Sequence, residues 1–133
     1  MATVSSPDIR HTRRVALKVL NPERGAVLGG LLHVVHPWLG NSDEASRAKW
    51  RRALARRAAR KPRVVVAGHK KSLDLPDSPE VLSQMDRYLA DFDSLRKVNT
   101  LGPELYQAML ARYPDLAVAM LLRYASRQAY RKQ

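Results

Sequence analysis

Apolar residues at helical spacing between Val81 and Phe92 constrain the fold of this chain more than any other feature of its sequence. Ser78 and Pro79 are typical of a helix start, because serine caps backbone N–H groups and proline already has a helical φ. Three- and four-residue steps then place a set of apolar residues on one helix face: Val81, Leu82, Met85, Tyr88, Leu89 and Phe92. A face of this width must be buried, so the sequence predicts a folded domain built against this helix.

The remaining segments predict short strands and further helices. We expect two strands joined by a turn over residues 15–20 and 26–39. A helix is expected over residues 41–60, because it must end before Pro62. A strand of β-branched residues is expected over residues 63–67. Asn41 is the expected cap of the helix over 41–60. Two more helices are expected to begin at Pro103 and Pro114. We therefore predict an α/β fold with a few short strands, covered by helices on one side, and with a helical C-terminal extension.

Length and composition narrow the class of protein. The chain has 133 residues and no cysteine, which excludes disulfides, thiolate nucleophiles and cysteine zinc sites. Its length fits one domain, which we expect over residues 15–133, after a mobile basic arm over residues 1–14. No apolar run reaches the roughly 20 residues of a membrane span, so we expect a cytoplasmic protein without membrane contact.

The net charge of +12 is concentrated in one segment. Residues 43–63 hold nine basic and two acidic residues, and therefore more than half of the excess. Within the predicted helix 43–60, three- and four-residue steps form a cationic stripe of four residues: Lys49, Arg52, Arg56 and Arg60. Such a stripe can bind phosphates of a nucleic acid or an acidic protein, and it can equally be the solvated face of an Arg-rich helix. Because no helix-turn-helix, zinc finger or aromatic RNA-binding motif accompanies it, we expect nucleic-acid binding to be weak.

A histidine that follows a strand and a glycine is the most specific candidate site. The strand residues Val64 to Val66 lead into Gly68-His69, so His69 is expected at the carboxyl edge of a sheet, where α/β proteins bind ligands. The alternative is a loop histidine without a function. His33 and His36 are expected to be structural, because in a strand over residues 31–35 their side chains would point to opposite faces.

A set of motifs resembles the second half of the metallo-β-lactamase-fold hydrolases. The residues that carry the resemblance are His36-Pro37-Trp38-Leu39, Trp50, Lys61 to Lys70, Asp77-Ser78-Pro79, Tyr88-Leu89 and Asp91-Phe92. It extends from about Val15 to the C-terminus and implies the C-terminal half of that β-sandwich. It also implies that His69 is a metal ligand, and that in an intact relative a zinc-bound water attacks an ester, thioester or lactam carbonyl.

The chain departs from this family at the other metal ligands. The family's His-x-His-x-Asp-His cluster is missing, His33-x-x-His36 has a different spacing, and Gly29-Gly30 stands where the family has its bridging aspartate. A catalytic zinc needs about three protein ligands. We therefore expect a truncated or degenerate hydrolase-like protein that lacks independent catalysis and binds no zinc by itself.

The missing half also predicts a sheet face that this chain does not cover. Such a face favours self-association or binding to a partner chain. The alternative, from a different class, is a small basic protein that binds nucleic acid or another protein through the helix 43–60.

Overall fold

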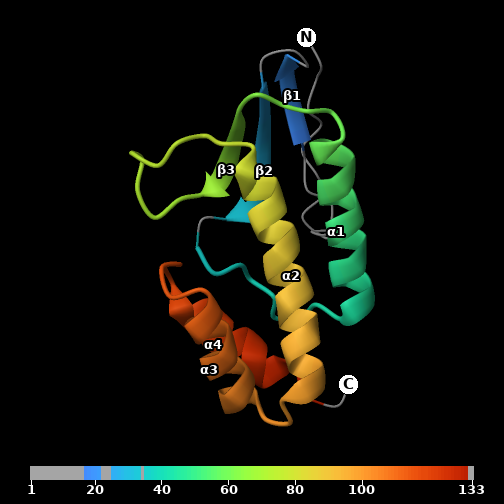
Figure 1. The fold of residues 1–133 in the computed structure, drawn as a ribbon, viewed down its shortest axis with the longest axis vertical. Coiled ribbons are helices and arrows are strands. Elements are labelled where there is room, and N and C mark those ends of the chain that lie inside the picture. Colours follow the sequence, from blue (N-terminus) through green and yellow to red (C-terminus); the bar gives the residue numbers. More distant parts are fainter. Residues whose placement is uncertain (1–16, 22–24, 34, 132–133) are drawn as a thin grey trace.

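The computed structural model of the chain describes residues 17–21, 25–33 and 35–131. In chain order these residues form β1 (Leu17–Asn21), β2 (Gly25–His33), α1 (Glu44–Ala58), β3 (Val65–His69), α2 (Glu80–Val98), α3 (Gly102–Arg112) and α4 (Ala119–Gln128) (Figure 1). The expected basic arm over residues 1–14 lies outside the described residues. In the part of the chain that the structure describes, no helix is long and apolar enough to cross a membrane. The predicted mixture of strands and helices is confirmed, and helices form the larger part.

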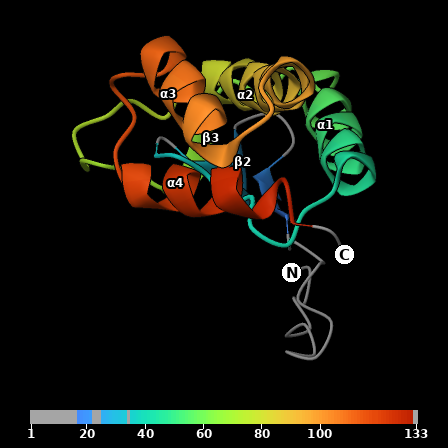
Figure 2. The same ribbon diagram turned by 90° about the horizontal axis from the view of Figure 1, so that it is seen from below.

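The three strands form one sheet in the order β1-β2-β3. β1 pairs with β2 in antiparallel register, and β2 pairs with β3 in parallel register. A parallel pair needs a long crossover between its strands, and α1 provides it. α1 and the first half of α2 lie together on one side of the sheet (Figures 1 and 2).

The side chains of β3 show that the sheet has two different faces. Val65 and Ala67 are buried, whereas Val66 is half-buried and Val64, just before the strand, is 39% exposed. Successive side chains of a strand point to opposite faces. One face of β3 therefore packs in the core, and the other face is accessible to solvent in the part of the chain that the structure describes.

The predicted apolar face of α2 is confirmed, because every residue assigned to it is buried: Val81, Leu82, Met85, Tyr88, Leu89 and Phe92. This face joins the two ends of the molecule, since its first half packs toward the sheet and its second half toward α3 and α4 (Figure 1). Leu105, Met109 and Leu122 from α3 and α4 are fully buried in the same core. The predicted helical C-terminal extension is thus part of the core.

A strap, residues 35–40, connects the end of β2 to the helical end of the molecule, which consists of α3, α4 and the second half of α2. Val35 forms an isolated bridge with Ala117, and the backbone N–H of His36 donates to the carbonyl oxygen of Ala117 at 2.9 Å. At Gly40 an added Cβ would lie 2.7 Å from the ring of Tyr124. The strap passes this close to α4 only because residue 40 has no side chain.

Several element boundaries differ from the sequence-based prediction, and β2 ends at His33 where the prediction places its end at Leu39. Asp43 caps α1, since its Oδ1 accepts from the N–H of Ser46 at 2.7 Å, whereas Asn41 has a left-handed φ of 62° and precedes the cap. β3 includes Gly68-His69, which the prediction placed beyond the strand. α4 begins at Ala119, because Ala117 is bound to the strap and the left-handed Val118 turns the chain into the helix.

Candidate functional site

His69 is the last residue of β3, at the carboxyl end of the strand, where the sequence predicts it. Its register partner is His33, the last residue of β2. Because the two strands are parallel, their carboxyl ends lie at the same edge of the sheet. The sequence reasoning missed this juxtaposition, since it compared His33 with His36 in one segment and not with His69 on another strand.

The sequence predicts a structural role for His36, and its contacts in the structure are of that kind. Its side chain is fully buried, and its Nδ1 forms a hydrogen bond of 2.9 Å with the hydroxyl group of Tyr88. Burial lowers the pKa of His36 from its ordinary value, because the charged imidazolium is poorly solvated there. Its Nε2 has no hydrogen-bond partner within the described residues. His36 therefore joins the strap to α2, and it does not lie in the strand with His33.

The described residues do not contain a donor set that fits a catalytic zinc. No group of three or more His, Asp or Glu side chains among them is placed to hold a metal ion. Gly29-Gly30, which the resemblance places where the family has its bridging aspartate, lies in β2, and glycine has no side-chain oxygen to offer. With about three protein ligands needed for such a centre, no reaction step can be derived through a metal on these residues.

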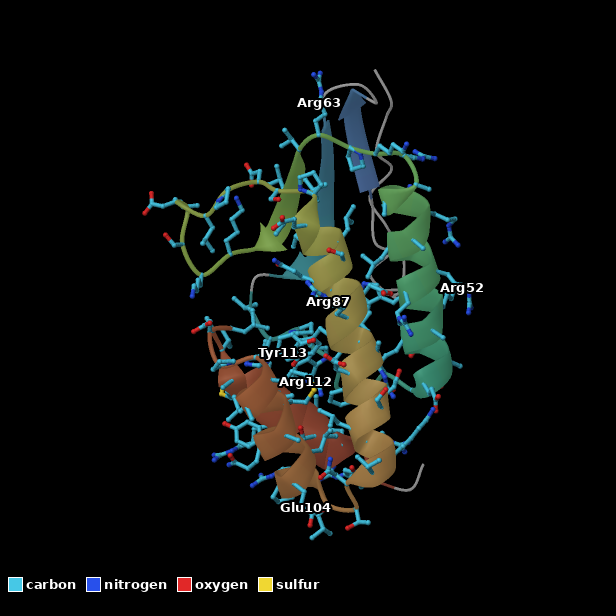
Figure 3. The ribbon with its side chains drawn as sticks, viewed as in Figure 1. Arg52, Arg63, Arg87, Glu104, Arg112 and Tyr113 are labelled. Carbon is cyan, nitrogen blue, oxygen red and sulfur yellow. The ribbon has the colours of Figure 1, made fainter. Side chains whose placement is uncertain are left out.

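The four residues of the cationic stripe lie on the outer side of the α1 segment. Lys49, Arg52 and Arg56 are in α1, while Arg60 follows its last residue, so the helix ends earlier than the predicted 43–60. All four side chains are exposed, and none has an ion-pair partner among the residues that the structure describes. Figure 3 shows Arg52 pointing outward from α1, away from α2. The stripe is therefore a surface of one charge sign.

Arg57 shows the electrostatic effect of this crowding. Desolvation lowers its pKa most, and the neighbouring positive charges of Arg60 and Arg56 lower it further. The Nε atom of Arg57 is buried and has no hydrogen-bond partner within the described ranges. The charged guanidinium in this position would be stabilised by any anion that approaches it.

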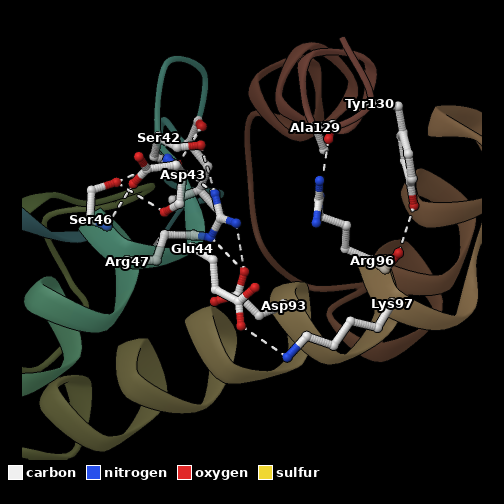
Figure 4. A network of polar contacts seen from close by, with 11 residues as sticks. Ser42, Asp43, Glu44, Ser46, Arg47, Asp93, Arg96, Lys97, Ala129 and Tyr130 are labelled. Atoms are coloured by element: carbon white, nitrogen blue, oxygen red, sulfur yellow. Dashed lines mark hydrogen bonds and ion pairs between the residues drawn. The ribbon is translucent and has the colours of Figure 1, made fainter. Parts of the chain in front are cut away.

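Two other arginines of α1 have a structural role that the sequence reasoning missed. Arg47 is 3% exposed, and its Nε donates to Oδ1 of Asp93 at 2.7 Å while its Nη1 donates to the carbonyl oxygen of Ser42 at 2.8 Å (Figure 4). Its guanidinium also lies 5.1 Å from the centre of the Phe92 ring. Arg51 pairs with Asp86 at 2.8 Å. These pairs fix α1 to α2, and they separate the structural arginines from the unpaired stripe.

The sequence predicts an uncovered sheet face, and the accessible face of β3 is the candidate for it. Val64 and Val66 lie on it, in a strand whose neighbour β2 is parallel. Parallel sheets normally have both faces covered. Here, within the described residues, α1 and α2 supply one cover only.

Comparisons with known proteins give no relative for this chain: no family model, no curated protein and no solved structure matches it.

Proposed function

We propose that this chain is a truncated or degenerate relative of the metallo-β-lactamase-fold hydrolases and lacks independent catalysis. The observation that carries the proposal is the one-sided sheet, in which helices cover one face while Val64 and Val66 are accessible on the other. Half of an α/β sandwich has this arrangement, because each half buries one sheet face against the other half. A strand that ends in Gly68-His69, directly after a helix that contains Trp50, adds the motif of the family.

The partner that we propose for the open face is a second copy of this chain. Val66 of β3 and Val64, just before the strand, lie on that face and carry no charge that would select a different protein. A two-fold axis brings the same patch of two copies together, so an apolar face is complementary to itself. Two stacked sheets with helices outside would restore the layers of the complete sandwich.

Sedimentation velocity over a range of protein concentrations tests this pairing. The wild-type protein is expected to form a dimer at micromolar concentration. Val64→Lys should shift it toward the monomer, because a desolvated lysine in the interface has no partner. Val98→Lys is the matched control, since Val98 is exposed at the far end of α2 and the substitution adds the same charge. It should leave the dimer unchanged.

A stable monomer with a cooperative thermal transition at all concentrations would contradict the pairing. So would an equal response of the dimer to Val64→Lys and Val98→Lys, since both would then act only through net charge.

Zinc analysis tests the lack of independent catalysis. The dialysed protein is expected to retain far less than one zinc per chain, because one histidine binds the metal too weakly, and His69→Ala should not change that content. Stoichiometric zinc that disappears in His69→Ala would mean that further ligands complete a site around this residue.

A second candidate function rests on the cationic stripe of Lys49, Arg52, Arg56 and Arg60. Its support is the absence of anionic partners for these side chains within the described residues, together with the poorly neutralised Arg57. We infer weak, sequence-independent binding to nucleic-acid phosphates, since each neutralised phosphate releases counterions and the affinity falls as salt rises.

Fluorescence anisotropy with a short DNA duplex in a salt series tests the stripe. Arg52→Gln combined with Arg56→Gln should weaken binding and reduce the salt slope by roughly one unit for each phosphate that is no longer neutralised. Arg123→Gln combined with Arg127→Gln, on exposed positions of α4, is the control for total charge. Sub-micromolar, sequence-selective binding at physiological salt would favour nucleic-acid binding over the hydrolase-related proposal.

A further inference from the structure

A cleft of about 420 Å³ lies between the strap, α2 and the segment after α3. Four apolar residues line it: Val35, Pro37, Met85 and Leu116. Its volume is within the range of about 300–1,000 Å³ that is typical of small-molecule sites, which combine an apolar lining with a few placed polar groups. The cleft lies where the strap passes α2, and its lining includes neither His69 nor a residue of the cationic stripe.

The floor of the cleft is made of buried and hydrogen-bonded side chains. Met85 and Tyr88 of α2 are buried, and the hydroxyl group of Tyr88 is held by Nδ1 of His36 at 2.9 Å. The ring of Tyr113 packs against that of Tyr88, with 4.8 Å between the ring centres. Burial raises the pKa of Tyr88 and of Tyr113, so both hydroxyl groups stay protonated at neutral pH. A ligand therefore meets a fixed aromatic and aliphatic surface.

The polar rim of the cleft carries an excess of positive charge. Asp91 is satisfied on both carboxylate oxygens, because Nη1 of Arg112 donates to Oδ1 at 2.7 Å and the hydroxyl group of Tyr113 donates to Oδ2 at 2.6 Å. Arg87, one helical turn before Asp91, also lines the cleft. It is exposed and has no ion-pair partner within the described residues. Figure 3 shows Arg87, Tyr113 and Arg112 close together between α2 and the helical end.

We propose that this cleft binds a small apolar monocarboxylate, with its carboxylate on Arg87 and its apolar body on the floor. A guanidinium presents parallel donors that match the two oxygens of a carboxylate. Arg112 is already engaged by Asp91, which leaves Arg87 as the group that selects the charge. The apolar floor favours a body such as a phenyl ring and disfavours a strongly hydrated anion such as sulfate.

Titration with benzoate, followed by backbone amide NMR shifts, tests the proposal on the full chain. Benzamide has the same shape without the charge, and sulfate has the charge without the apolar body. Benzoate is expected to shift residues of the cleft and to bind more tightly than either. Arg87→Gln should weaken benzoate binding roughly tenfold or more, as expected when a hydrogen bond between charged groups is removed. Arg127→Gln, at an exposed position of α4 that does not line the cleft, is the matched control and should leave the affinity unchanged.

A second variant tests the apolar part of the site. Leu116→Trp should fill the cleft and remove benzoate binding, and circular dichroism should show a folded protein, since Leu116 is only half-buried. Three results would overturn the proposal: equal affinity for benzamide and benzoate, an unchanged affinity in Arg87→Gln, or amide shifts confined to residues outside the cleft.

Discussion

The helical end of this molecule has a core packed from several elements, whereas the sheet end leaves one face of β3 accessible to solvent. At the helical end, made of α3, α4 and the second half of α2, Phe92, Met109 and Leu122 are fully buried. At the sheet end, β3 buries Val65 and leaves Val64 accessible. The closed core of the chain and its accessible sheet face therefore lie in different parts of the molecule.

The two ends are closed by different means. At the helical end the strap returns from β2 to Ala117, so residues far apart in the sequence complete one core. At the sheet end, in the part of the chain that the structure describes, α1 and the first half of α2 cover a single face. The core of the helical end is therefore closed within the chain, although Met120 remains 73% exposed on its surface, and we expect that a partner covers the sheet end.

The strongest test of this comparison is a matched pair of truncations to alanine. Phe92→Ala should lower the free energy of unfolding by about 3–5 kcal/mol, because it leaves a cavity in a closed core. Val66→Ala should lower it by under about 1 kcal/mol in the monomer, since that side chain is only half-buried. Urea denaturation at low protein concentration measures both. If Val66→Ala costs as much as Phe92→Ala, the sheet end is a complete core as well.

A second pair of variants sharpens the comparison along α1. Arg47, near the helical end, is 3% exposed and pairs with Asp93, so Arg47→Ala should lower the free energy of unfolding by about 3 kcal/mol. Arg51, nearer the sheet, pairs with Asp86 but is 43% exposed, so Arg51→Ala should cost under about 1 kcal/mol. Thermal unfolding followed by circular dichroism measures the two. Equal losses would show that the solvent exposure of an ion pair does not decide how much it contributes to the free energy of unfolding.

The sequence predicts those parts of the fold that depend on local spacing. The buried face of α2 follows from steps of three and four residues, and α3 follows from Pro103. The start of α4 could not be predicted in the same way, because it depends on the bridge between Val35 and Ala117. No local pattern contains an interaction over that distance.

The candidate sites show the same limit. The exposure of the cationic stripe follows from helical periodicity, whereas the burial of Arg47 depends on Asp93 in another helix. A cleft lined by Val35, Arg87 and Leu116 combines three separate segments, so it has no signature in the sequence. The position of His69 at the carboxyl end of β3 was predictable, but its pairing with His33 required the strand order.

The smallest expected effect is a pH dependence that arises from His36 in the strap. Because burial holds the pKa of His36 below 6.5 in the folded state, the unfolded chain binds a proton that the folded chain does not. The free energy of unfolding should therefore fall as the pH drops below about 6.5, by at most about 1.4 kcal/mol per pH unit from this residue. His36→Gln, which keeps a hydrogen-bonding group for Tyr88, should flatten this slope, while Val66→Ala at the sheet end should retain it. Urea denaturation at a series of pH values measures the slopes, and an unchanged slope in His36→Gln would assign the acid sensitivity to another group.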